Sequence, residues 1–171
     1  MIRRTLLLFA TATALCLHAA EKFTVGNLTF TKPEKWTRVE IPAGMRAAQL
    51  EIKGEQGQKA EVVFFNLPGG GGGVQANIDR WLGMFEGGKD KINAKTDKVK
   101  LEKGTITYVQ AEGTYLSGMP GGPKTPQPGS MLQGAILEAP EPGIFIRMTG
   151  PAALVKSAQQ DFRKMIESAL K

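Results

Sequence analysis

The sequence predicts an α+β fold in which a mostly antiparallel β-sheet is packed by two helices. Three observations support this prediction. Short runs of alternating apolar and polar residues recur along the chain, with the period of a strand that buries one face. Two longer stretches repeat their apolar residues at helical spacing instead. These elements follow one another as strands, a helix, more strands and a second helix, an order typical of an antiparallel sheet with helices packed on it.

The first predicted strands form a hairpin. Residues 23–25 and 28–30 alternate between apolar and polar side chains. Gly26-Asn27 between them suits a two-residue turn with glycine at its first central position. Pro33-Glu34 then interrupts the pattern, and residues 36–39 resume it as a short extended piece.

Two further strands are predicted before the first helix. Residues 45–52 alternate, with Ala48, Leu50 and Ile52 on one face, which indicates a strand with its other face in water. Residues 60–65 are more continuously apolar and predict a strand in the interior of the sheet. The intervening Gly54–Gly57 has the composition of a turn.

The first predicted helix follows a run of five glycines, Gly69–Gly73. Its apolar residues recur at spacings of three and four, which is the stripe of an amphipathic helix. Gly87-Gly88 is expected to end it. The stripe consists of Val74, Ile78, Trp81, Leu82 and Phe85. We expect Trp81 to be buried against the sheet and Arg80 to point away from it.

The second half of the chain contains two segments of unusual composition. Residues 89–103 are rich in lysine and predict a solvated connection that runs into a strand near residues 99–101. Residues 105–115 favour a strand because they are rich in Thr, Ile, Tyr and Val. Residues 118–129 contain four glycines and four prolines, including Pro120, and predict an irregular loop.

The last elements are a hairpin and a helix. Residues 131–137 and 144–148 are apolar runs on either side of Pro140-Glu-Pro-Gly143, as expected for two strands joined by a longer loop. Pro151 then suits the first turn of a helix. The apolar stripe of this helix consists of Leu154, Val155, Ala158, Phe162, Met165, Ile166 and Ala169.

The N-terminus predicts export. Arg3 and Arg4 precede an apolar stretch of 13 residues, and small residues follow it up to Ala20. This order is typical of a cleaved secretory signal, and the stretch is too short to span a membrane as a helix. We expect residues 1–20 to be removed, residues 21–171 to form a single domain, and the protein to be periplasmic or secreted. Lipidation of Cys16 and twin-arginine export are less favoured alternatives.

Removal of this segment would restrict the chemistry open to the protein. The only cysteine and the only histidine of the 171 residues, Cys16 and His18, both lie in it. The remaining chain could form no Ser-His-Asp triad, cysteine nucleophile, thiolate or imidazole metal site, or disulfide. It would carry 20 basic and 16 acidic residues, a net charge of +4, since Arg3 and Arg4 are lost. We expect a non-enzymatic protein without cofactor or metal.

Two segments resemble a family of small exported bacterial proteins of unknown function. These segments are Val74–Phe85 and Met148–Val155, and the resemblance extends from about Asn27 to Leu170. The order of elements is also similar to the PsbP-like fold, an α/β/α sandwich with a central antiparallel sheet. That resemblance implies a non-catalytic partner or assembly factor, although a shared fold does not transmit function. It implies no catalytic residues.

Candidate binding residues surround the first helix. Asn77 and Arg80 lie three residues apart on one helix face and could jointly grip a carboxylate or a carbonyl. The glycine run, with Gly71 and Gly72, leads into the helix N-terminus, where free N–H groups favour an anion. It lacks the Gly-Lys-Ser/Thr of a nucleotide-binding loop. We add Arg46 and Arg147, around which a ligand pocket could form, and Lys124 in the Pro/Gly-rich stretch.

Three functions remain open. The first is an exported, non-enzymatic domain that binds a protein or cell-envelope partner through the glycine run, the outer face of the first helix and the Pro/Gly-rich stretch. The second is a binding module for a small anionic ligand at the start of that helix. The third is a hydrolase that uses two carboxylates. Nucleic-acid binding is disfavoured because residues 89–103 have no interleaved aromatic residues and include three acids.

Overall fold

A seven-stranded antiparallel sheet organises the molecule. The computed structural model describes residues 20–67, 69–118, 121–139 and 143–171. The strands of the sheet lie in the order β3-β4-β5-β9-β8-β7-β6, and β1 and β2 form a separate hairpin. The strands are β1 (Lys22–Val25), β2 (Leu28–Thr31), β3 (Thr37–Arg38), β4 (Arg46–Lys53), β5 (Lys59–Asn66), β6 (Asn93–Leu101), β7 (Gly104–Ser117), β8 (Thr125–Glu138) and β9 (Ile144–Pro151). The helices are α1 (Gly73–Leu82) and α2 (Ala152–Glu167), with short 3-10 turns at Glu55–Gly57 and Gly70–Gly72.

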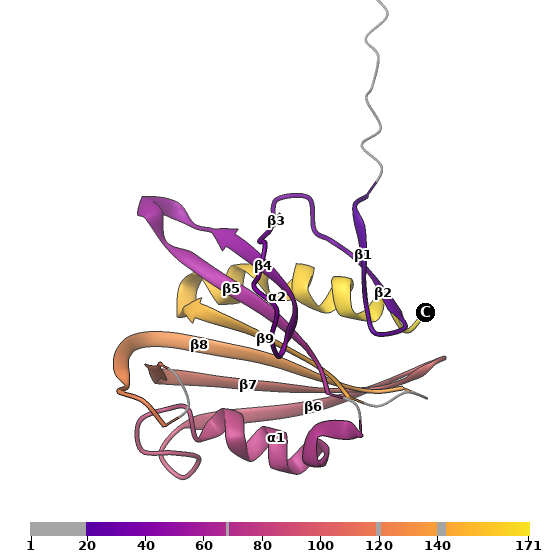
Figure 1. Cartoon of the computed structure of the whole chain (residues 1–171). Coiled ribbons are helices and arrows are strands. Elements are labelled where there is room, and N and C mark those ends of the chain that lie inside the picture. Colours follow the sequence, from indigo (N-terminus) through magenta and orange to yellow (C-terminus); the bar gives the residue numbers. More distant parts are fainter. Residues whose placement is uncertain (1–19, 68, 119–120, 140–142) are drawn as a thin grey trace, which may run out of the picture.

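The sheet separates two helical layers. Helix α1 packs on one face, whereas α2 and the β1–β2 hairpin pack on the other (Figure 1). This arrangement confirms the predicted α+β class, a mostly antiparallel sheet packed by two helices. No helix among the described residues is long and apolar enough to cross a membrane. Residues 1–19, and with them nearly all of the predicted export signal, lie outside the described residues.

The larger hydrophobic core lies between the sheet and α2. The turn of the β1–β2 hairpin is the predicted one, with Gly26 at a positive φ of 58°. The hairpin brings Phe23 and Phe30 against Phe64 of β5, with ring centroids 5.2 Å apart in both edge-on pairs. Such edge-on aromatic pairs stabilise a core beyond the area they bury. The hairpin is therefore an integral part of the α2 layer.

The second core lies between the sheet and α1. Trp81, only 3% exposed, lies at its centre, as the helical spacing predicts. Gly134 of β8 makes room for the indole, because a Cβ atom there would lie 2.2 Å from Trp81 Cζ3. Arg80 is exposed, also as predicted.

The predicted loop at residues 118–129 is only partly a loop. Met119 and Pro120 lie outside the described residues, but β8 begins at Thr125 and includes Pro126 and Pro128. Proline is tolerated in this part of the strand because residues 125–129 pair with β7 alone, whereas β9 joins β8 from Ser130 onward. On the side without a neighbouring strand, no carbonyl group needs the N–H group that proline lacks.

The lysine-rich segment is also more ordered than its composition predicts. It is expected to connect into a strand near residues 99–101, but β6 begins at Asn93 and pairs with β7 along all nine of its residues. Pairing with a long neighbouring strand decides the conformation here, and local composition does not.

Tyr108 gives a testable pH dependence. It is buried in the α2 core, its hydroxyl has no hydrogen-bond partner in the described part of the chain, and the Arg163 guanidinium lies 4.0 Å from its ring centroid. Burial, reinforced by the nearby Glu167, raises the pKa of the Tyr108 phenol well above its ordinary value of 10.0. The unfolded chain therefore loses the phenolic proton at lower pH than the native protein.

The free energy of unfolding should consequently fall as the pH rises above about 10. Urea titrations between pH 8 and 11 would measure this slope. Tyr108→Phe removes the ionisable group and should flatten it, with little loss of stability at neutral pH because the packed ring stays in place. An unchanged slope in Tyr108→Phe would assign the alkaline sensitivity to other groups.

Candidate functional site

The glycine run is tied to α1 by Asn77. This side chain is only 2% exposed, and its amide nitrogen donates to the carbonyl oxygens of Gly71 at 3.0 Å and Gly73 at 2.7 Å. Its carbonyl oxygen accepts from Arg80 Nη1 at 2.6 Å. Both amide hydrogens are thus donated within the protein, and none is available for a ligand in this arrangement. Asn77 acts as a brace for the helix start.

Gly71 and Gly72 are shaped by packing and turn geometry. Both have positive φ, 53° and 92°, a conformation that glycine adopts readily. A Cβ atom on Gly71 would lie 3.0 Å from Leu67 and 3.2 Å from Phe145. The run therefore packs against Leu67 and Phe145 as a compact turn.

Arg147 occupies an unusual position on β9. It is 9% exposed, in a strand whose neighbours on the chain are apolar. Its guanidinium lies 5.8 Å from the centroid of the Phe65 ring, and Nη1 is 2.9 Å from the sulfur of Met84. A thioether is only a weak acceptor. The buried Nε has no hydrogen-bond partner, and no carboxylate pairs with Arg147 among the residues described.

Arg46 approaches the same place from the other side. It begins β4 opposite Phe65 of β5 in the strand register. Its guanidinium donates to Gln49 Oε1, and Nη1 lies 3.4 Å from Glu61 Oε2. Phe65 therefore has Arg46 beside it on one neighbouring strand and Arg147 on the other.

Two of the predicted arginines consequently lie together, at what we call the α1–β5 seam and define by Arg46, Phe65, Met84 and Arg147. The seam carries two cations. In the described chain the one carboxylate seen to pair with them is Glu61. Arg80 is exposed and donates to Asn77, and no contact joins it to the seam in the described chain.

The remaining predicted residues do not converge on this seam. Gly71 and Gly72 lie before the N-terminus of α1, about 15 Å from its other end for a helix of this length. Lys124 stands at the exposed tip of the β7–β8 hairpin, beside Thr125, which pairs with Ser117. That hairpin contacts the opposite end of α1, where Leu116 N–H donates to the Met84 carbonyl at 2.8 Å. The glycine run and the β7–β8 hairpin therefore lie at opposite ends of α1, with the helix between them.

Phe65 and Met84 were not predictable as members of the seam. Phe65 reads as one more apolar residue of an interior strand, and its role depends on which strands flank β5. Met84 lies two residues after the last residue of α1, where the helical period no longer indicates its direction. One feature of the sequence could have indicated the site. Arg147 is a charged residue within an otherwise apolar strand, and arginine is rarely buried without a specific partner.

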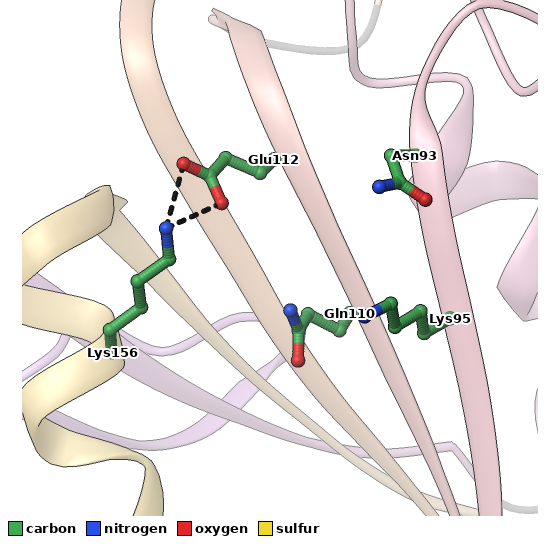
Figure 2. A pocket seen from close by; sticks show the side chains of 5 residues that line it. All are labelled: Asn93, Lys95, Gln110, Glu112 and Lys156. Carbon is green, nitrogen blue, oxygen red and sulfur yellow. Dashed lines mark hydrogen bonds and ion pairs between the residues drawn. The ribbon is translucent and has the colours of Figure 1, made fainter.

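Two hollows of the surface lie elsewhere. One of about 430 Å³ on the α2 side of β6 and β7 is lined by polar side chains, and Lys156 binds both carboxylate oxygens of Glu112 there, at 2.9 and 2.8 Å (Figure 2). A longer groove of about 770 Å³ runs between α1 and β6. None of the predicted arginines lines either hollow, so neither is the deep arginine pocket expected of a small-ligand module.

Two carboxylates do face each other, but not in a pocket. Glu51 and Glu61 are opposite each other in the β4–β5 register, and each is partly exposed and ion-paired, with Lys59 and Arg46 respectively. An acid catalyst needs an apolar site that favours its protonated form. This pair therefore gives the hydrolase hypothesis no support. The described residues also contain no group of three or more metal-ligating side chains.

Comparison with known proteins identifies the fold. No protein-family profile and no curated protein matches the sequence. The structure is similar to the solution structure of cyanobacterial PsbP (CyanoP) from Synechocystis sp. PCC 6803, with a TM-score of 0.55 and 9% sequence identity, over 92% of this chain and 96% of that chain. At such low identity the likeness concerns the fold alone. The chain therefore has a PsbP-like fold.

Proposed function

We propose that this chain is an exported, non-enzymatic accessory domain that binds a protein or cell-envelope partner through the α1–β5 seam. One observation carries the proposal, namely the buried Arg147 guanidinium without a carboxylate partner in the described chain. Burying an unpaired charge is unfavourable, and a partner carboxylate would compensate it. The planar guanidinium favours such a ligand because it can bind both oxygens at once.

The surroundings of Arg147 support this function. Arg46 adds a second positive charge beside Phe65 and would attract an acidic group during association. Met84 covers the guanidinium with an unbranched side chain, which changes rotamer easily and can move aside. A positive, partly apolar seam of this kind is suited to an acidic side chain or a chain terminus on a larger partner.

Export rests on the N-terminal sequence, with its basic residues, apolar stretch and small residues in the order of a cleaved signal. The non-enzymatic assignment rests on residues 21–171, which contain neither cysteine nor histidine. The second candidate, a module for a small anion, is favoured by the same arginines, although the helix start is occupied by the Asn77 brace.

Arg147→Met tests the proposal. It replaces a buried, poorly paired cation by an apolar side chain of similar length, so the melting temperature should stay equal or rise. Capture of a partner from an envelope extract of the source cells should fall at least tenfold. The matched control is Arg38→Met on β3, which removes an exposed arginine that lies over the Phe23 ring and should leave capture unchanged.

Equal capture by the wild type and Arg147→Met would exclude the seam as the binding surface. A different pattern would favour the small-anion module. In that case a low-molecular-weight envelope fraction would raise the melting temperature of the wild type but not that of Arg147→Met, and no macromolecule would be captured.

A further inference from the structure

The long open edge of the sheet lies at β6, away from the α1–β5 seam. β6 is the last strand in the sheet order, and β7 is its one neighbour. Beyond this pairing, no backbone hydrogen bond to residues 93–101 is present in the described chain. The opposite edge differs, because β3 has only two residues, Thr37 and Arg38. The outward N–H and C=O groups of β6 therefore form a template to which another strand can add.

A groove accompanies this edge. Its volume is about 770 Å³, and it lies between α1 and β6. Val74, Ile78 and Leu82 of α1 form an apolar wall, and Ala94, Thr96 and Lys98 of β6 form the floor. Side chains of an added strand would point alternately to the two faces of the sheet. Those on the α1 side would lie next to the groove and could place apolar groups against the wall.

The charges along β6 define the partner. Lys98 and Lys100 lie on the α1 side of the strand by its alternation, and Lys95 lies on the other side. In the described chain none of the three has an ion-pair partner. Asp97 and Asp79, which also line the groove, are bound by Arg163 at 2.9 Å and Lys89 at 3.7 Å. The edge is thus positive, and Asp90 is the one groove carboxylate without an ion pair among the residues described.

We propose that β6 binds an extended, acidic segment of a partner protein by strand addition, with alternate apolar side chains of that segment in the α1–β6 groove. Backbone hydrogen bonds would supply affinity, and the groove and the lysines would supply specificity. A second copy of this chain is disfavoured, because two β6 edges would bring lysines close to lysines. The inference does not depend on the seam, since the two surfaces share no residue.

The probe is a capped nine-residue peptide in which valine and glutamate take turns at the odd positions, which face the α1 side of the sheet, and threonine fills the even positions. It is compared with a peptide in which lysine replaces glutamate. We expect the acidic peptide to bind the domain comprising residues 21–171 and the lysine peptide not to bind. Amide hydrogen exchange, read by NMR, should slow at least tenfold at alternate residues of β6, because only every second amide points to the open edge. Amides of the α1–β5 seam should be unaffected.

A charge reversal provides the matched variants. Lys98→Glu combined with Lys100→Glu should weaken binding of the acidic peptide at least tenfold and allow the lysine peptide to bind. The control Lys164→Glu changes an exposed lysine on α2 and should leave both results as in the wild type. NMR spectra of each variant establish that it is folded. No saturable binding at millimolar peptide, protection outside β6, or dimerisation through β6 would each overturn the proposal.

Discussion

Trp81→Ala should lower the free energy of unfolding by about 3–5 kcal/mol, because it leaves a large cavity in the α1 core. The indole is 3% exposed and lies among buried apolar residues from three strands, including Val109, Leu132 and Phe145. The loss is a sizeable share of the about 5–15 kcal/mol that stabilises a typical domain. Urea unfolding of residues 21–171, followed by circular dichroism, would measure it.

The control is Gln75→Ala on the exposed face of the same helix. Gln75 donates to Asp79 at 3.2 Å in solvent, so its loss should change stability by no more than about 0.5 kcal/mol. A Trp81→Ala effect as small as that of Gln75→Ala would mean that α1 contributes little to the folded state.

Gly134→Ala should be the next most damaging change, at about 3 kcal/mol, since overpacking a filled core forces side chains or backbone to move. The new Cβ atom would lie 2.2 Å from Trp81 Cζ3 and 2.5 Å from Cε3. The indole is held by the sheet on one side and by its own helix on the other. Thermal and urea unfolding of the single variant would give the loss.

A double-mutant cycle tests whether the clash with Trp81 causes the loss of stability in Gly134→Ala. With Trp81 already replaced by alanine, the methyl group of Gly134→Ala enters the cavity and should cost much less than in the wild type. Neighbouring residues that share a cavity show such non-additive effects, of about 0.5–3 kcal/mol. Additive losses would show that Gly134 is required for the conformation of β8 rather than for the indole.

The sequence predicts most of the elements because their periods are local. The stripe through Ile78 and Trp81 reveals α1, and the alternation around Leu50 reveals β4. Composition fails where a neighbouring strand overrides it. Pro126 and Pro128 lie in β8 because that end of the strand has a single neighbour, and a lysine-rich stretch becomes β6 because β7 is long enough to pair with all of it.

The candidate site is predictable in its charges but not in its geometry. Arg46 and Arg147 can be named from the sequence, but what joins them is the β4–β5–β9 order, which strand periodicity does not encode. Asn77 illustrates the opposite case. Its spacing from Arg80 is that of a ligand-binding pair, yet the fold uses its amide to hold the glycine turn.

The division of the interior by the sheet has a dynamic consequence. The apolar contacts of α1 form a cluster separate from the one that α2 shares with the β1–β2 hairpin. Helix α1 can therefore detach as a cooperative unit while the other layer stays folded, at a free energy below that of global unfolding. Because Met84 lies only two residues beyond α1, each such opening would also uncover Arg147. The free energy needed to open this short helix would then determine the fraction of time for which the Arg147 guanidinium is exposed to solvent.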